Sequence, residues 1–509
     1  MTFDTIYTEV PYHKDPLSLY QSLTGNAEHT MLLESAEIES KAHLQSIIMP
    51  HSCLMIQCDA EQISFSALTA NGLALLTPIK HYFADEQIIE SETRLTVTLV
   101  QKSQVMDEDQ KLLDRSSLDG LRALINKFNQ QNDNEPMFIG GVLAFDLIAT
   151  SEPLPTVATA ENDCPDYLFY VAETLIKIDH TTQKAQLTGF VFDDSSANHD
   201  RISAQSQQLI DACKQPLTNI SQQPVEVDVT VNISDESFKN QVNELKQHII
   251  AGDVFQVVPS RCFSLPCPNP LGAYRTLKQT NPSPYMFYFN GNGFTLFGAS
   301  PESAVKYDKQ SNQVEVYPIA GTRPRGKTAS GDIDSDLDSR IELELRLDQK
   351  ELSEHLMLVD LARNDVARIS ETGTRKVAEL LKVDRYSHVM HLVSRVTGQL
   401  KSQLDALHAY QACMNMGTLT GAPKVRATQL IREVEQQRRG SYGGAVGYLN
   451  SMGDMDTCIV IRSAYVKNNV AHIQAGAGVV FDSDPQSEAD ETRQKAQAVI
   501  TAIKTGGGQ

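Results

Sequence analysis

The stretch Ala475-Gly-Ala-Gly-Val-Val-Phe-Asp-Ser-Asp-Pro-Gln-Ser-Glu-Ala-Asp-Glu-Thr-Arg493 carries the strongest structural signal in the chain. It predicts the end of a strand hinged by glycines, followed by a helix whose first turns contain Glu488 and Glu491. These two glutamates are three residues apart and therefore share one helix face. Gly476 and Gly478 allow a ligand to approach the backbone closely. The stretch thus predicts a small anion on the glycines and a hard cation on the carboxylates.

The composition is that of a globular protein with a large core. The chain has 509 residues, 41% hydrophobic and 21% charged, and this length predicts two or more domains. A net charge of −20 argues against nucleic acid or an acidic membrane surface as partner, because both would repel the chain. The amino terminus lacks a signal-peptide pattern and no apolar run reaches the length of a membrane span, so a cytoplasmic location is expected. The eight cysteines form no C-x-x-C pair, which predicts free, buried thiols.

One polar stretch divides the chain. Residues 213–232 contain two prolines and no helical period, which is typical of a boundary. Before this stretch, short strand-like runs such as residues 138–148 are separated by polar loops. After it, helical and strand patterns alternate to the end of the chain. We therefore predict an amino-terminal portion, residues 1–225, and an α+β domain, residues 233–505.

Two elements are expected at the start of the second part. Residues 235–252 carry apolar side chains at helical spacing and end at a glycine, which predicts an amphipathic helix. Residues 253–260 are mostly apolar and predict a buried strand. The glycine-rich tail, residues 506–509, is expected to be disordered.

Residues 321–328 match the phosphate-loop pattern G-x-x-x-x-G-K-[ST]. This motif binds phosphate only when a strand precedes it and a helix begins at its lysine. A strand is plausible at residues 314–317, but the run after Thr328 is rich in glycine and acid and is a poor helix start. Pro324 also removes a backbone amide that such a loop needs. The nucleotide-hydrolase hypothesis is therefore disfavoured.

A further acidic residue, Glu354, lies in an apolar helical pattern. The residues predicted on that helix face are Leu347, Glu354, Leu358 and Leu361. A buried carboxylate is costly unless it is paired or bound to a metal. Glu354 could instead pair with a nearby arginine, and Glu491 could form an i,i+4 surface pair with Lys495. Taken together, Glu354, Glu488 and Glu491 could make an oxygen-only Mg²⁺ site.

Several stretches together resemble the chorismate-utilising enzymes. The matching stretches are Ala299-Ser-Pro-Glu302, Pro318-Ile-Ala-Gly-Thr-Arg-Pro-Arg-Gly326, Glu354-His-Leu-Met-Leu-Val-Asp-Leu361, Thr418-Leu-Thr-Gly-Ala-Pro-Lys424, Arg439-Gly-Ser-Tyr-Gly-Gly444 and residues 475–493. The resemblance implies a β-sandwich core flanked by helices, with an amino-terminal regulatory portion packed against it. It also implies that Glu354 and Glu491 bind Mg²⁺, with Glu488 close by. The metal would hold the ring carboxylate of chorismate and neutralise its charge.

The resemblance further implies a substrate pocket. The residues that it assigns to chorismate are Gly321, Thr322, Tyr442, Arg462, Gly476, Ala477 and Gly478. Arg462 would pair with the enolpyruvyl carboxylate through two hydrogen bonds. Without the resemblance, a single arginine after a strand would be interpreted as structural.

Three residues are implied in the chemistry. Glu302 would be the general acid that protonates the departing C4 hydroxyl; its structural alternative is a turn carboxylate that caps the next segment. His391 corresponds to the family histidine beside that hydroxyl, although two histidines on an apolar segment more often pack than react. Thr418 begins a loop that would close near the substrate, and the alternative is an ordinary turn around glycine and proline.

Two departures distinguish among the branches of the family. Gln256 stands where the water-activating members carry a lysine, and Ala320 stands where the aminodeoxychorismate-forming members tend to carry one. Both favour ammonia as nucleophile at C2, followed by loss of pyruvate to give anthranilate. Formation of aminodeoxychorismate, isochorismate or salicylate remains the alternative within the family. No glutaminase motif is present, so ammonia is expected from a separate glutamine amidotransferase subunit.

The amino-terminal half resembles the inhibitor-binding part of the same family. The residues that would bind tryptophan as a feedback inhibitor are Glu34, Ser35, Pro284, Tyr285 and Met286. Glu34 would meet the ammonium group, and residues 284–286 would line a pocket for the indole. A non-catalytic tryptophan sensor is a further alternative, but it would require a disrupted metal site, and Glu354 and Glu491 are both present.

Overall fold

The computed structural model describes residues 3–35, 44–99, 107–125, 135–193, 195–328, 330–386 and 389–508. Within them the helices are α1 (Pro16–Thr24), α2 (Ala70–Tyr82), α3 (Glu108–Leu113), α4 (Asp119–Ile125), the 3₁₀ helix η1 (Phe145–Thr150), α5 (Ser196–Cys213), α6 (Asp235–Ala251), α7 (Pro270–Thr280), α8 (Ser335–Leu347), α9 (Gln349–Ile369), α10 (Ala406–Cys413), α11 (Lys424–Glu435) and α12 (Pro485–Gly506).

The strands are β1 (Asp4–Val10), β2 (Thr30–Glu34), β3 (Gln45–Asp59), β4 (Gln62–Ala67), β5 (Gln87–Glu90), β6 (Arg94–Thr98), β7 (Phe138–Leu143), β8 (Tyr167–Asp179), β9 (Lys184–Val191), β10 (Thr230–Val231), β11 (Gln256–Val257), β12 (Ser260–Pro266), β13 (Tyr285–Asn290), β14 (Thr295–Ser300), β15 (Ser303–Asp308), β16 (Gln313–Val316), β17 (Ile319–Pro324), β18 (Lys376–Arg385), β19 (Val389–Gln399), β20 (Gly421–Ala422), β21 (Ala445–Asn450), β22 (Met455–Ile459), β23 (Ser463–Lys467) and β24 (Val470–Gly476).

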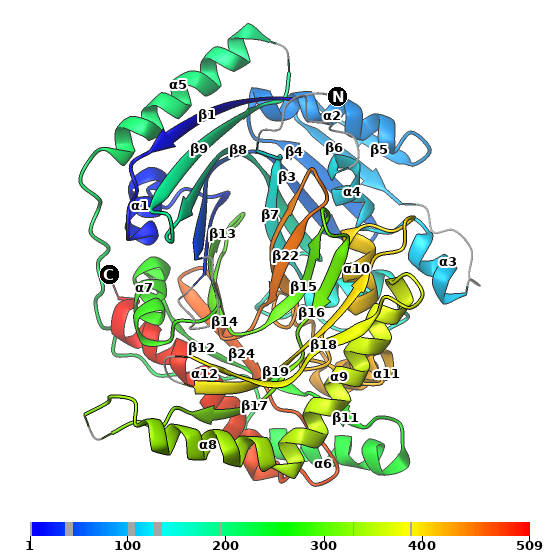
Figure 1. Ribbon diagram of the computed structural model, residues 1–509. Coiled ribbons are helices and arrows are strands. Elements are labelled where there is room, and N and C mark those ends of the chain that lie inside the picture. The colour runs from blue at the N-terminus through cyan, green and yellow to red at the C-terminus, as the bar shows by residue number, and fades with distance from the viewer. Residues whose placement is uncertain are drawn as a thin grey trace.

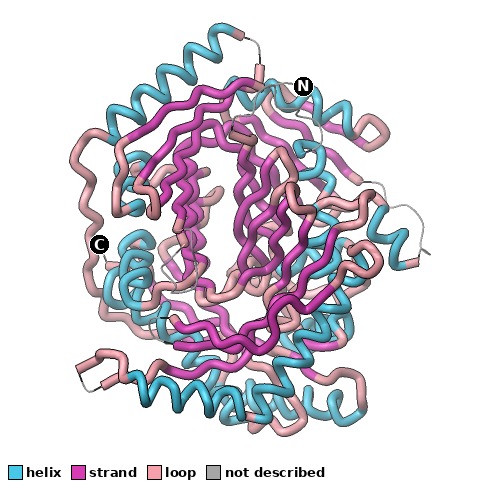
Figure 2. Tube along the Cα trace, viewed as in Figure 1, coloured by secondary structure: helices cyan, strands magenta, loops and turns pink. Residues whose placement is uncertain are grey.

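The predicted mixture of helices and antiparallel strands is confirmed. Strands fill the middle of the molecule in facing arrays, and the helices lie around the outside (Figures 1 and 2). Among the described residues, β11 pairs only with β20 in a small separate sheet, and the remaining strands belong to one connected sheet system. Buried apolar side chains fill the space between the arrays, with Phe169, Val171 and Leu449 fully or almost fully buried. This packing is what a sandwich of sheets with helical cover requires.

The sheet system crosses the predicted boundary between the two parts of the chain. Strand β2 pairs with β13, and β7 pairs with β21. The polar linker expected between the parts corresponds to the irregular chain between α5 and β10. The division at residues 1–225 and 233–505 stays a prediction, and the two parts share backbone hydrogen bonds across it.

Local sequence signals explain the helices that carry the site. Helix α6 begins after the N-cap Ser234 and ends at Gly252, which has a left-handed φ of 84°, so the prediction for residues 235–252 is confirmed. The strand expected at residues 253–260 is shorter, since β11 has two residues and β12 begins at Ser260. Asp348 caps α9 by accepting from the backbone amides of Lys350 and Glu351.

That cap corrects the predicted apolar face around Glu354. Leu347 belongs to α8 and is 63% exposed, because the chain leaves the helical conformation at Asp348 before α9 begins. Leu358 is buried as expected. The face therefore starts inside α9, and the helical period does not continue back to Leu347.

The carboxyl-terminal tail is ordered as far as it is described, which corrects the expectation of disorder. Helix α12 continues to Gly506, the carbonyl of Gly507 accepts from the amide of Asn269 at 3.0 Å, and the amide of Gly508 donates to Gln223 at 2.8 Å. The absence of side chains lets these glycines pack against other backbone. Gln509 lies outside the described residues.

Seven of the eight cysteines are buried and Cys262 is half-buried, which agrees with the burial that the sequence predicted. Among the described residues, no helix combines the length and the apolar character needed to cross a membrane.

Candidate active site

Glu302 is a buried carboxyl group that accepts a hydrogen bond from Thr418. It follows β14 and is 6% exposed. The Thr418 hydroxyl donates to its Oε1 at 3.1 Å. Burial raises the pKa of Glu302 to about 8. A carboxyl group that keeps its proton near neutral pH is suited to donate that proton to a leaving group, and the structure brings the predicted pair Glu302 and Thr418 together.

His391 lies on β19 directly opposite Thr322 on β17. Its Nδ1 is 2.9 Å from the Thr322 hydroxyl. Burial, and to a smaller extent the positive charge of Arg462, lower the pKa of His391 to about 4. The imidazole is therefore neutral near neutral pH. It can donate one hydrogen bond and accept another, but it is not an imidazolium that could serve as the general acid.

Arg462 contributes a positive charge to the site. It follows β22 in a left-handed conformation with φ of 49°. Burial lowers the pKa of Arg462, and the groups whose charges act on it are Tyr442, Glu491 and Glu302. Within the described part of the chain, no hydrogen bond or ion pair engages its guanidinium. An unpaired, poorly hydrated guanidinium can accept a carboxylate in a bidentate arrangement.

Gly476 and Gly478 lie where any side chain would collide with neighbouring residues of the site. A Cβ at Gly476 would come within 2.8 Å of the Pro259 carbonyl oxygen and 3.1 Å of the Tyr442 hydroxyl. A Cβ at Gly478 would come within 3.1 Å of the side-chain nitrogen of Gln256. The amide of Ala477, between them, donates to the Pro259 carbonyl at 3.1 Å. Residues 476–478, the glycine cradle predicted to bind substrate, therefore lie against Tyr442 and Gln256.

Most of the stretch from Pro318 to Gly326, which contains the predicted substrate residues Gly321 and Thr322, forms strand β17. Gly321 has φ of +74°, and a Cβ there would come within 3.0 Å of Leu345 and 3.2 Å of Glu351. Strand β17 ends at Pro324, and the next helix, α8, begins only at Ser335. No helix begins at Lys327, so the structural context that a phosphate loop requires is missing here.

The three glutamates predicted to bind metal influence one another. The pKa of Glu354 is raised to about 7, mainly by burial, and the charges of Glu491 and Glu488 contribute to this shift. Burial also raises the pKa of Glu488. Oε1 of Glu354 and Oε2 of Glu488 are buried without a hydrogen-bond partner, which fits the donor set of a hard divalent cation.

The surface pair that was the alternative for Glu491 is present, whereas Glu354 faces a lysine and not the arginine that was its alternative. Lys350 Nζ stands 3.8 Å from Glu354, and Lys495 Nζ is 2.6 Å from Glu491. Lys495 also donates to the carbonyl of Gly476 at 3.0 Å, so it belongs to the site, a role that the sequence did not reveal. As these side chains lie, no group of three or more His, Cys, Asp or Glu among the described residues could hold a metal ion.

The residues predicted to bind tryptophan lie on or beside two paired strands, β2 and β13. Glu34 on β2 lies opposite Met286 on β13. Glu34 is 6% exposed; it accepts from the Tyr274 hydroxyl at 2.8 Å and pairs with Lys278. Its carboxylate therefore already faces an ammonium group of this chain. Ser35 follows the strand, and its amide donates to the Gln45 carbonyl at 3.0 Å. Strand β13 begins at Tyr285, and Pro284 directly precedes it.

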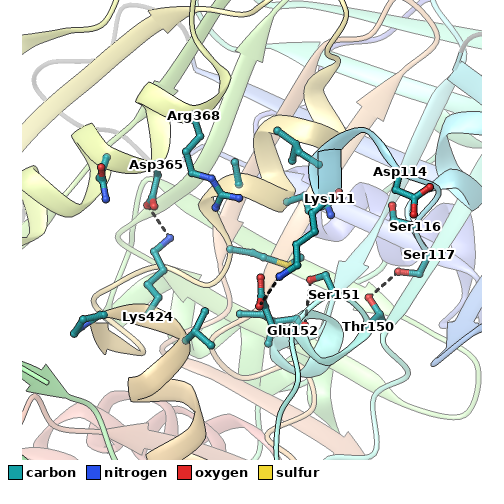
Figure 3. A pocket seen from close by; sticks show the side chains of 18 of the residues that line it. Lys111, Asp114, Ser116, Ser117, Thr150, Ser151, Glu152, Asp365, Arg368 and Lys424 are labelled. Atoms are coloured by element: carbon teal, nitrogen blue, oxygen red, sulfur yellow. Dashed lines mark hydrogen bonds and ion pairs between the residues drawn. The ribbon is translucent and has the colours of Figure 1, made fainter. Parts of the chain in front are cut away.

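A separate cavity of about 850 Å³ lies between α3, η1, α9, α10 and the start of α11. Figure 3 shows Lys424 reaching Asp365 on one wall and Lys111 reaching Glu152 on the other; the two ion pairs measure 2.7 and 3.5 Å. None of the predicted substrate, metal or inhibitor residues lines this cavity. It borders the far end of the Thr418–Lys424 loop.

The fold and this site define a class of protein: the chain belongs to the chorismate binding enzyme family, whose pattern matches residues 81–501. Within that class it is similar to component 1 of anthranilate synthase. It is 58% identical to the Vibrio cholerae protein, with 98% of this chain and 96% of that protein covered. It is 53% identical to the Escherichia coli protein, with 99% and 97% covered.

Solved structures give the same result. Anthranilate synthase component I from Streptococcus pneumoniae superimposes with a TM-score of 0.70 at 30% identity, covering 91% of this chain and 94% of that chain. A menaquinone-specific isochorismate synthase from Escherichia coli superimposes with a TM-score of 0.65 at 18% identity, covering 98% and 94%. The second likeness shows the fold alone. This chain is an enzyme that acts on chorismate.

Proposed function

We propose that this chain is the aminating component of anthranilate synthase, which converts chorismate and ammonia to anthranilate, pyruvate and water as a carbon–oxygen lyase. The observation that carries the proposal is the buried Glu302 carboxyl, held by Thr418 and protonated near neutral pH, in one site with the unpaired guanidinium of Arg462. The first supplies a proton to the leaving group, and the second receives a carboxylate of the substrate.

The chemistry uses these groups in two stages. Ammonia forms a bond to C2 of the ring, the double bonds shift, and the C4 hydroxyl departs as water with the proton of Glu302. The new ammonium nitrogen then gives up one proton, which restores the Glu302 carboxyl. Loss of the C2 proton then makes the ring aromatic while the enolpyruvyl ether is released, and its methylene carbon takes up a proton to give pyruvate. His391, neutral and fixed by Thr322, is suited to orient the departing hydroxyl.

Mg²⁺ is proposed as the cofactor, held by Glu354 and Glu491 with Glu488 close by. The orphaned oxygens of Glu354 and Glu488 support this assignment, and Glu491 must exchange its contact with Lys495 for the ion. When bound, the metal neutralises the ring carboxylate of chorismate and withdraws electron density from the ring.

Ammonia is proposed as the nucleophile because Gln256, beside Gly478, has no basic group with which to activate water. The similarity to proteins named component 1 supports a second component that supplies the ammonia, and we propose a glutamine amidotransferase subunit. Formation of isochorismate is less well supported, because that likeness rests on the fold alone.

Feedback inhibition by tryptophan is proposed at β2 and β13. The paired strands bring Glu34 and Met286 side by side. A buried carboxylate that already binds the ammonium group of Lys278 could bind that of an amino acid by exchanging partners.

The test is to incubate the purified chain with chorismate, Mg²⁺ and an ammonium salt at mildly alkaline pH, without a second component. Fluorescence and mass spectrometry identify the product. Anthranilate with an equal amount of pyruvate is expected. Isochorismate, salicylate or aminodeoxychorismate would replace the proposed reaction with one of its relatives, and unchanged chorismate would contradict the proposal.

A further inference from the structure

Arg439 is a fully buried arginine that bonds to two separate backbone segments of the site. It is 1% exposed and lies three residues before Tyr442. Its Nη1 donates to the carbonyl of Leu419 at 2.8 Å, and its Nη2 donates to the carbonyl of Val258 at 2.6 Å. The guanidinium is a rigid planar fork, so these two bonds fix the distance between the two segments.

The charge of Arg439 is balanced inside the protein. Glu435 Oε2 accepts from its Nε at 2.9 Å, and Glu435 is itself 6% exposed. The backbone amides of Arg439 and Gly440 both donate to Asp146, at 3.0 and 2.9 Å. The guanidinium also stacks over the Phe145 ring with its carbon 4.7 Å from the ring centre. The arginine is thus anchored to η1, in the amino-terminal half.

Each segment held by Arg439 leads directly to a residue of the site. Leu419 follows Thr418, whose hydroxyl bonds to Glu302. Val258 follows β11, where Gln256 lies against Gly478. Glu435 adds a third connection, since it accepts from the Ser260 amide at 2.7 Å and the Ser260 hydroxyl at 2.8 Å.

Ser260 in turn lies opposite Gly476 in the sheet. Strand β11 pairs with β20 at the end of the Thr418 loop, and Val257 exchanges two backbone hydrogen bonds with Val479. The proton donor and the glycine cradle are therefore connected through one small sheet, with the Arg439 guanidinium bonded to segments on both sides of it.

We propose that Arg439 is a positioning residue that holds the Thr418 hydroxyl against Glu302 and the Gln256 strand against Gly478. It touches neither substrate nor reacting atoms, and its effect depends on the proposed amination of chorismate. Small displacements of reacting groups have large effects on rate. Arg439 lies over the ring of Tyr442, with its guanidinium carbon 5.6 Å from the ring centre. Among the described residues, however, its side-chain hydrogen bonds go to Leu419, Val258 and Glu435 and not to Arg462, the proposed carboxylate receptor. Binding of chorismate should therefore change less than turnover.

Arg439→Lys tests the role, because lysine keeps the charge beside Glu435 but cannot bond to Leu419 and Val258 in the same geometry. Arg432→Lys is the matched control. Arg432 is also buried and also binds Asp146, at 2.7 Å, but its second bond goes to the Pro155 carbonyl at 3.0 Å, away from the site. The measurements are kcat and KM for chorismate with ammonia, normalised to the folded fraction from circular dichroism.

We expect Arg439→Lys to lower kcat about 10- to 100-fold and to change KM no more than about threefold, with Arg432→Lys close to wild type. Equal losses in the two variants, or a normal kcat in folded Arg439→Lys, would overturn the role. If Arg439→Lys does not fold, Glu435→Gln decides by the same criteria, and failure of both to fold would assign the network to stability alone. A wild-type chain that makes no anthranilate would instead overturn the proposed function itself, and this role with it.

Discussion

Glu302 shows at the scale of one residue how burial creates chemistry. Its neighbours in sequence, Ser300 and Pro301, only suggest a turn, whereas the fold places its carboxyl away from water and raises its pKa to about 8. The raised pKa should affect both the pH dependence of kcat and the pH dependence of the free energy of unfolding. Substitutions at Thr418 and at Glu302 test these two effects.

The Thr418 hydroxyl should tune the pH dependence of turnover. A general acid works only while protonated, so kcat should fall as pH rises through about 8, the pKa to which burial raises Glu302. The bond from Thr418 lowers that pKa. Thr418→Val should therefore move the alkaline limb of the kcat profile to higher pH, and a limb that moves to lower pH would contradict the assignment. The profile is measured with saturating chorismate and ammonia.

Glu302→Gln should inactivate the enzyme and yet stabilise it in alkali. Because the pKa of Glu302 is raised in the folded state, the stability due to its proton is complete below about 4.5 and is lost as pH rises through about 8, at about 1.4 kcal/mol per pH unit. Glutamine never ionises. Urea unfolding should give equal stabilities at pH 4 and a more stable variant at pH 9, with kcat reduced about 10²- to 10⁴-fold.

The control for this substitution is Glu92→Gln, which makes the same change of charge at an exposed position before β6. It should leave the pH dependence of stability unchanged. A Glu302→Gln variant that loses stability at pH 9 would show that the buried carboxylate is stabilised in the fold and would contradict its role as an acid.

At the scale of elements, α9 and α12 bring carboxylates from distant parts of the chain within electrostatic range. The proposed ion should therefore stabilise their packing. Addition of Mg²⁺ should raise the melting temperature of the wild type, since a ligand that binds only the folded state stabilises it. Glu491→Gln should lose this rise and Mg²⁺-dependent turnover while staying folded.

Asp490→Asn is the matched control for the metal, because Asp490 lies beside Glu491 in sequence, is exposed and bonds only to Gln486 and Arg493 among the described residues. It should keep the thermal shift. Retained Mg²⁺-dependent turnover in Glu491→Gln would refute the metal assignment.

The pairing of β2 with β13 is the element that should carry inhibition. Ser35→Leu places a larger side chain at the end of β2, next to the Glu34 carboxylate, and should weaken inhibition by tryptophan while leaving uninhibited turnover intact. Ser402→Leu, on an exposed turn far along the chain, should leave inhibition unchanged. Rates measured over a tryptophan series decide, and full inhibition of Ser35→Leu would count against this site.

At the scale of the whole molecule, the two halves complete one another. The fully buried β7 pairs with β21, and β2 pairs with β13, so a fragment of residues 233–508 would expose unpaired strand edges and apolar surface. We expect this fragment to lack a cooperative thermal transition, and the full chain to unfold in one transition by calorimetry. A soluble fragment with its own sharp transition would establish an independent domain.

The sequence by itself determined the local structure and the chemistry of the parts. The helical period and closing glycine of α6, the failed context of the phosphate loop, and the acids of α9 and α12 all follow from rules that act within a few residues. The resemblance of short motifs added predicted roles for Glu302, His391, Thr418 and Arg462, because such motifs can be compared with those of the family without knowledge of the fold.

Only the tertiary structure decided which of these parts meet. The charge of Arg439 looks in sequence like that of its neighbour Arg438, yet Arg439 is buried against Glu435 and Arg438 is half-buried. The docking of the glycine tail likewise depends on partners far away in the chain, Asn269 and Gln223. Burial, hydrogen bonding between distant segments and shifted pKa values arise from packing, and packing is a property of the folded chain rather than of any stretch of its sequence.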